Sequence, residues 1–208
     1  PNINLLAVIV AVPVIGMTII APALTIIKND LNISFENTQL ILTLYFTFLA
    51  FGQILTGPFS DKYGRKPILL LGASIYSISA FFASFSSNIE ILLILRCFQG
   101  FGAAACLSVG RTILSDCYEI NEAAKEMSKM TAIMAVIPIS CFIFGGFLAE
   151  FLGWRTNLIA LGLISLILII AMSFLLNETL IKKAKSISFK NMFIVYRGLL
   201  KTLSFNFF

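Results

Sequence analysis

Six apolar stretches of about twenty residues each dominate the chain, and no soluble fold of this size can bury so many. A bilayer core about 30 Å thick is crossed by roughly 20 helical residues, each rising about 1.5 Å. The 208 residues are 59% hydrophobic and 12% charged, with a mean hydropathy of +0.97. We therefore expect an all-α membrane protein with spans near residues 3–27, 38–58, 67–85, 91–113, 129–149 and 156–176.

The distribution of Lys and Arg among the connections predicts the orientation of these spans. Connections on one side carry two basic residues, and those on the other side carry twelve. The first set comprises 28–37, 86–90 and 150–155, and the second comprises 59–66, 111–129 and 177–202. Cytoplasmic loops carry an excess of Lys and Arg, so both ends of the chain are predicted to be cytoplasmic. The basic segment 177–202 is then a cytoplasmic linker beside anionic headgroups, and no nucleic acid is expected as a partner.

The remaining composition argues against several kinds of site. His is absent, and the four Cys residues show no CxxC spacing, so neither a metal site nor a disulfide framework is expected. No span pairs a nucleophile with a general base. We predict a protein that is not an enzyme and that has no cofactor.

A charge-dense stretch, GPFSDKYGRKP at 57–67, separates the second and third spans. Gly64 permits a left-handed turn, and Pro58 and Pro67 fit the ends of helices. Asp61 is placed to accept backbone N–H groups or to meet the positive end of a helix. For "KYGRK" alone, a tight turn that carries topology-setting charge is the simpler interpretation.

The full pattern resembles the G-x-x-x-D-x-x-G-R-R/K motif of the major facilitator superfamily, which lies between the second and third helices of that family. The matching residues are Gly57, Asp61, Gly64, Arg65 and Lys66. The resemblance implies that Asp61, Arg65 and Asp116 form a conformational latch in which Asp116, at the end of "RTILSD", pairs with Arg65.

Other stretches carry the same resemblance along nearly the whole chain. "LLILRCFQGFGAAA" at 92–105 resembles the fourth-helix motif, and "GMTIIAPAL" at 16–24 resembles the first helix of drug exporters. "AVIPISCFIFGG" at 135–146 resembles the antiporter motif of the bicyclomycin-resistance (Bcr/CflA) subgroup. The last of these contains Pro138, Gly145 and Gly146.

The resemblance implies the N-terminal half of a secondary transporter in a bacterial inner membrane. Such a protein exports small amphipathic molecules by alternating access, with protons as the coupling species. A metabolite or nutrient carrier of the same superfamily, an inactive truncated remnant and a membrane scaffold remain alternatives.

An internal echo supports a duplicated architecture independently of the family. "GPFSDKYGR" starts at Gly57 and "GFLAEFLGWR" starts at Gly146, with the same spacing from Gly to acid to Gly. The copies lie three spans apart, so they face opposite sides of the membrane. This is the pattern expected of a 3+3 inverted repeat.

Polar residues inside the spans are candidates for a substrate cavity. A buried Arg is costly unless it faces a bundle interior or a wet cavity, and Arg96 lies well inside the fourth span. An arginine that reaches the outer interface is the alternative for this residue. The predicted cavity residues are Arg96, Gln99, Thr18, Met17, Tyr45 and Gln53.

Two departures from the family pattern bear on mechanism. Thr18 stands where relatives in the subgroup often carry an acidic residue, and no carboxylate lies near the middle of any predicted span. Proton coupling therefore rests on the resemblance alone. Family members have two six-helix halves, whereas this chain has one, followed by the basic linker and "LSFNFF" at 203–208, which looks like the start of a seventh helix. A C-terminal half, missing or on another chain, is the expected partner.

Overall fold

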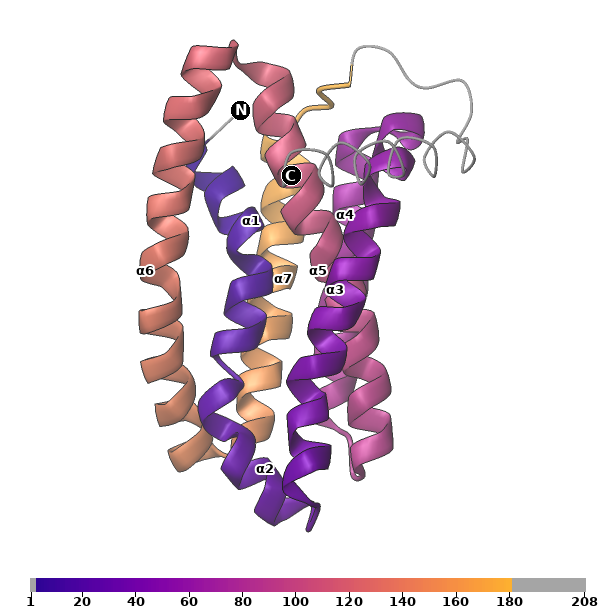
Figure 1. The fold of residues 1–208 in the computed structure, drawn as a ribbon, viewed down its shortest axis with the longest axis vertical. Helices are drawn as coiled ribbons and strands as arrows, with labels where there is room; N and C mark the ends of the chain where they lie inside the picture. Colours follow the sequence, from indigo (N-terminus) through magenta and orange to yellow (C-terminus); the bar gives the residue numbers. More distant parts are fainter. Residues whose placement is uncertain (1–2, 181–208) are drawn as a thin grey trace, which may run out of the picture.

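A computed structural model of the chain describes residues 3–180, and the regular structure in this range is entirely helical. Six helical spans run side by side, alternating in direction (Figure 1). By length and composition, all six are able to cross a membrane. The helices are α1 (Ile3–Thr18), α2 (Leu24–Asp30), α3 (Phe35–Tyr63), α4 (Arg65–Ser84), α5 (Ile89–Cys117), α6 (Ile120–Leu152) and α7 (Trp154–Leu175). The predicted linker beyond residue 180 and the predicted start of a seventh helix lie outside the described residues.

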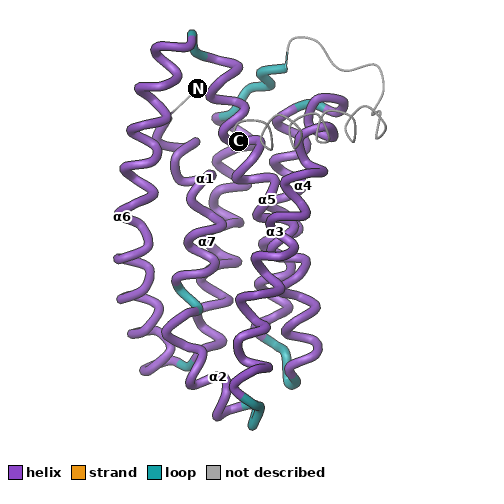
Figure 2. The backbone as a smooth tube through the Cα atoms, in the orientation of Figure 1, coloured by secondary structure: helices purple, strands orange, loops and turns teal. Residues whose placement is uncertain are grey.

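The first span is broken rather than continuous. Helix α1 ends at Thr18, a short 3-10 turn covers Ala21–Ala23, and α2 completes the span. Figure 2 shows the break as a loop segment within the span. Pro22 lies in the turn and has no N–H to donate, so the regular α-helical bonding stops there.

The helices extend beyond the predicted spans because hydropathy locates only the part that lipid surrounds. The predicted connection at 111–129 is mostly helical, since α5 runs to Cys117 and α6 begins at Ile120. The polar first turns of α6 contain Ala, Glu, Lys and Met, which are good helix formers. Helix α6 also continues without interruption through Pro138.

Two joints between consecutive helices consist of a single glycine. Gly64 joins α3 to α4 with φ 112° and ψ 154°, and Gly153 joins α6 to α7 with φ 86° and ψ 152°. Residues with a side chain rarely adopt these positive φ values. The left-handed turn predicted at Gly64 is therefore present, and the same backbone geometry recurs at the corresponding glycine of the internal echo.

Helix α5 packs against α3, α4 and α1. Small residues on α5 allow close approach: a Cβ on Gly102 would lie 2.5 Å from the carbonyl oxygen of Gly72 on α4. Without a hydrophobic driving force between helices in lipid, such close backbone packing is a main source of association. It fixes α4 against α5 and so positions the residues at their ends.

Candidate functional site

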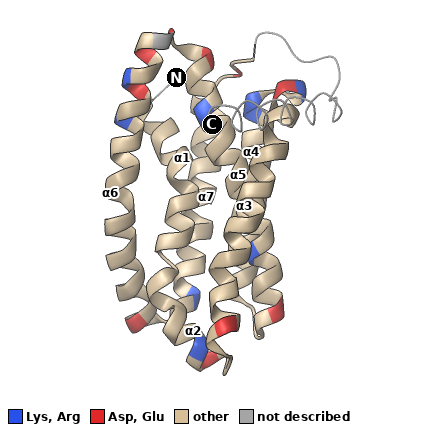
Figure 3. Ribbon diagram, viewed as in Figure 1, with Lys and Arg blue, Asp and Glu red and all other residues tan. Residues whose placement is uncertain are grey.

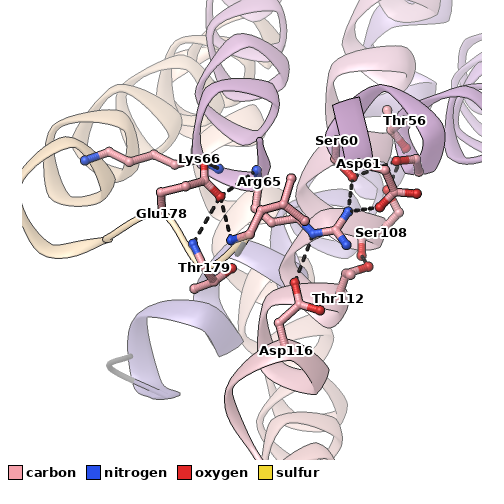
Figure 4. Close-up of polar contacts among 12 residues, drawn as sticks. Thr56, Ser60, Asp61, Arg65, Lys66, Ser108, Thr112, Asp116, Glu178 and Thr179 are labelled. Atoms are coloured by element: carbon pink, nitrogen blue, oxygen red, sulfur yellow. Dashed lines mark hydrogen bonds and ion pairs between the residues drawn. The ribbon is translucent and has the colours of Figure 1, made fainter. Parts of the chain in front are cut away.

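Arg65 is the first residue of α4, and its side chain forms hydrogen bonds with polar groups of two neighbouring helices (Figure 4). Its Nη1 donates to the Ser60 hydroxyl at 2.6 Å and to the Asp61 carboxylate at 2.5 Å. Its Nε donates to the Asp116 carboxylate at 3.0 Å. Ser60 and Asp61 lie near the end of α3, and Asp116 lies in the last turn of α5, so the guanidinium joins three helices at one end of the bundle. We call these four residues the Arg65 cluster.

In the Arg65 cluster the arginine side chain is buried, and the two carboxylates are partly exposed to solvent. The Arg65 side chain is 8% exposed, whereas those of Asp61 and Asp116 are 52% and 28% exposed. Water screens partly exposed ion pairs, so each is worth about 1 kcal/mol or less. The cluster can therefore favour one arrangement of the helices while remaining easy to break.

Glu178, which lies just after the end of α7, contacts the start of α4 beside the Arg65 cluster. Its two carboxylate oxygens accept the backbone N–H groups of Arg65 (2.9 Å) and Lys66 (3.2 Å), which are free donors at the start of α4. It also accepts the N–H groups of Thr179 and Leu180 at 3.0 Å each. Partial burial acts to raise the pKa of Glu178, but these four hydrogen bonds outweigh it and hold the pKa below its ordinary value.

The capping role that the sequence predicted for Asp61 therefore belongs to Glu178. Asp61 lies in the last turn of α3, where it faces the Arg65 side chain instead of the N-terminus of α4. Glu178 was missed because capping patterns are local, whereas it lies 113 residues from Arg65 in the chain. Its one sequence signal is its place as the first acidic residue after the sixth span.

Further hydrogen bonds hold α3, α4, α5 and α7 together near the Arg65 cluster. The Lys66 ammonium donates to the Ser173 carbonyl at 2.8 Å, which ties α4 to the end of α7. The hydroxyls of Thr56 and Ser108 share a hydrogen bond of 2.6 Å between α3 and α5. Gly57 and Pro58 lie inside α3, so Pro58 is not at the helix end predicted for it.

A second polar group surrounds Arg96 in the middle of the bundle. Its guanidinium donates to the Gln99 side chain at 2.6 Å and to the Gly16 carbonyl at 3.2 Å, and its carbon lies 4.6 Å from the centre of the Tyr45 ring. Arg96, Gln99 and Tyr45 are all 0% exposed. Arg96 thus does not reach toward the interface, and in this conformation the three side chains are sealed among the helices rather than open to a cavity.

The other predicted cavity residues are Thr18, Met17 and Gln53. Thr18 is buried and donates to the Val14 carbonyl at 2.8 Å, while Met17 and Gln53 are half-buried. A hollow of about 560 Å³ opens between α1 and α6, and none of the predicted cavity residues lines it. Its lining comprises Ile15, Ala132, Ile133, Val136, Ile137, Ser140 and Cys141. The cavity role of the six residues stays a prediction.

The fifth-helix motif lies against the break in the first span. A Cβ on Gly145 would collide with the Ile19 backbone, and one on Gly146 would lie 3.6 Å from the Pro22 ring. The small residues of this motif therefore let α6 approach the broken segment closely.

Comparisons with known proteins agree on one family. A profile of the Major Facilitator Superfamily matches residues 6–205. A bicyclomycin resistance protein homolog of Haemophilus influenzae is 30% identical over 174 residues, covering 84% of this chain and 44% of that protein. A chloramphenicol resistance protein of Pseudomonas aeruginosa is 33% identical over 150 residues, covering 72% and 36%. The chain thus spans less than half the length of these curated relatives.

Solved transporter structures share the fold. A bacterial homologue of the human lysosomal transporter Spinster, inward-facing and unoccupied, has a TM-score of 0.68 at 23% identity, covering 80% of this chain and 41% of that one. The human organic anion transporter MFSD10 has a TM-score of 0.69 at 18% identity, covering 92% and 53%. The six described spans therefore correspond to about half of such a transporter.

Proposed function

We propose, because this chain belongs to the major facilitator superfamily, that it acts as one six-helix half of an exporter of small amphipathic molecules. The superfamily consists of membrane transporters, not enzymes. A second six-helix half completes the substrate path, and the two halves rock about it to give alternating access.

The observation that carries this proposal is the Arg65 cluster. Arg65 joins the ends of α3 and α5 through two carboxylates and one hydroxyl, at the joint that follows Gly64. A charged cluster at the membrane rim that costs little to break is suited to hold one conformation and release it during transport. We assign the latch role to Asp61, Arg65 and Asp116, with Gly57, Gly64 and Lys66 shaping the joint.

The charges also support an orientation. Figure 3 shows charged residues at the two ends of the bundle and few between them. The end with the Arg65 cluster carries most of the basic residues, which places it in the cytoplasm by the positive-inside tendency. The basic residues at this end are Lys62, Arg65, Lys66, Arg111, Lys125 and Lys129, and those at the other end are Lys28 and Arg155. Both ends of the chain would then be cytoplasmic.

Export of amphipathic compounds is favoured by two observations. The relatives from H. influenzae and P. aeruginosa carry the names of resistance proteins, and the hollow between α1 and α6 is lined mainly by aliphatic side chains. An apolar wall with a few polar groups suits an amphipathic ligand.

Dye accumulation in bacteria that lack their own exporters tests the proposal. The chain is expressed with the separately encoded C-terminal half of the H. influenzae relative, and each half alone serves as a control. We expect the pair to lower accumulation of an amphipathic cationic dye, and Asp116→Asn to abolish most of this effect. Glu119→Gln, which removes an exposed charge at the same end, is the matched control. Accumulation equal to the empty vector in cells that contain both halves in the membrane would refute drug export.

A further inference from the structure

A second charged cluster lies at the end of the bundle opposite the Arg65 cluster. Asp30, the last residue of α2, accepts hydrogen bonds from the Trp154 indole N–H at 3.0 Å and from the Arg155 guanidinium at 2.8 Å. The same guanidinium donates to the Ser86 carbonyl at 3.2 Å and lies 4.3 Å from the centre of the Trp154 ring. One carboxylate thus connects the end of the first span to the start of α7 and, through Arg155, to the α4–α5 loop.

This cluster corresponds to the Arg65 cluster under the inverted repeat. Arg65 follows the Gly64 joint directly, and Arg155 follows the Gly153 joint with Trp154 between them. Their acidic partners, Asp116 and Asp30, lie at the ends of the first span of each three-span unit. In both clusters the Arg comes from one unit and the acid comes from the other. The two ion pairs therefore bridge the units at opposite ends of the bundle.

The segment that Asp30 holds is separate from the rest of its span. Helix α2 has seven residues and follows the break at Ile19–Ala23. Side chains from other helices satisfy the carbonyls at the break: Asn157 donates to Ile19 at 2.8 Å, and Arg96 donates to Gly16 at 3.2 Å. An unpaired carbonyl in lipid is costly, so these bonds allow the break to persist. The break can therefore persist inside the bundle, and Asp30 holds the end of α2 beyond it.

We propose that Asp30 and Arg155 are positioning residues that clamp α2 against α7, and that release of this clamp lets α2 swing about the Ile19–Ala23 break. The gating role of this motion rests on the proposed transport function. Asp30 and Arg155 side chains are 44% and 41% exposed, so water weakens their ion pair and α2 is released reversibly. The half opens at this end when the clamp breaks.

Labelling of a buried reporter cysteine tests the clamp without any substrate. Ile27 lies in α2 and is 0% exposed, so Ile27→Cys becomes reactive only when α2 moves. Native Cys106, on α5 and 1% exposed, reports on wider unfolding in the same molecule. The full chain is purified in detergent, which makes the assay independent of membrane orientation. The three other native cysteines are replaced by Ser.

Neutralising the clamp should make α2 open more often. We expect Asp30→Asn and Arg155→Gln each to speed maleimide labelling of residue 27 about three- to tenfold, as expected for loss of a weak ion pair and its hydrogen bonds. Labelling of Cys106 should stay unchanged. The exchange of both charges, Asp30→Arg with Arg155→Asp, keeps the ion pair but loses the bonds to Trp154 and Ser86, so labelling should be slower than in either single variant. Glu90→Gln removes an exposed charge at the same end and should have no effect.

Two results would overturn the clamp. Equal labelling of residue 27 in all variants would show that the ion pair does not hold α2. Faster labelling of Cys106 together with residue 27 would show that the pair supports the whole fold rather than one segment. Since neither measurement involves transport, a positive labelling result with no dye export would refute only the proposed function.

Discussion

Close packing between α4 and α5 predicts that Gly102→Ala is destabilising where the same change at Gly57 is not. A Cβ at position 102 would lie 2.5 Å from the Gly72 oxygen and 2.7 Å from the Tyr76 nitrogen, both backbone atoms of α4. Ordinary contacts begin near 3.4 Å, so α4 has to move away from α5. A Cβ at position 57 would meet nothing within 4 Å.

The comparison of the two variants isolates the cost of this displacement. Both glycines lie inside helices, so the gain in helix propensity, about 1 kcal/mol, cancels between them. Overpacking a close contact costs about 1–3 kcal/mol. At about 2–4 °C per kcal/mol for a chain of this size, Gly102→Ala should unfold roughly 2–12 °C below Gly57→Ala.

Circular dichroism of the purified variants in detergent, heated under identical conditions, measures this difference. The displacement should also draw Arg65, at the start of α4, away from Asp116 at the end of α5. Equal unfolding temperatures for the two variants would mean that α4 and α5 do not approach as closely as the structure shows. The small residues of α5 would then have no packing role at this crossing.

Three further predictions concern polar contacts. Asp116→Asn should lower the unfolding temperature by only about 1–4 °C, because its ion pair with Arg65 is partly exposed to water. Glu119→Gln is the control. A drop above about 8 °C for Asp116→Asn would contradict the argument that water screens this pair. Since the pKa of Glu178 is lowered from its ordinary 4.5, its capping stabilises the fold fully above that pH and is lost as the pH falls through the lower folded value. Acid unfolding of Glu178→Gln should accordingly be less steep between about pH 5 and 3, and an unchanged profile would exclude the cap. Asn157→Leu leaves the Ile19 carbonyl without its donor and should lower the free energy of unfolding by about 1–3 kcal/mol, measured by thermal unfolding. Wild-type stability of this variant would show that the Ile19 carbonyl does not need the Asn157 side chain.

The sequence predicted the number of spans correctly because lipid imposes a length and a polarity that each segment must meet by itself. It also predicted the pairing of Arg65 with Asp116 through the family motif, and the geometry contains that pair at 3.0 Å. The ends of the helices were less predictable. The polar start of α6 forms a helix by its own propensity, a property that hydropathy does not measure.

Contacts between distant residues were the part that sequence reasoning could not supply. Glu178 reaches α4 across 112 or more residues, and Asp30 reaches Arg155 across 125. The residues next to Glu178 and Asp30 in the sequence do not indicate which groups these carboxylates contact, because those contacts depend on how the spans pack. The second copy of the internal echo covers residues 146–155 alone, so it includes Arg155 but gives no indication that Asp30 is its partner.

The environment of Arg96 has a consequence for how the chain is assembled in the cell. Its partners in residues 3–180 are uncharged, and they lie on α1, on α3 or one turn away on its own helix. Synthesis proceeds from the N-terminus, so α1 and α3 have already left the ribosome when α5 emerges. The cation therefore enters the bilayer beside acceptors that are already in place, which lowers the penalty of inserting it. The Ile19 carbonyl is in the opposite situation: it is synthesised early, and its donor lies on α7, the last of the six spans to be made.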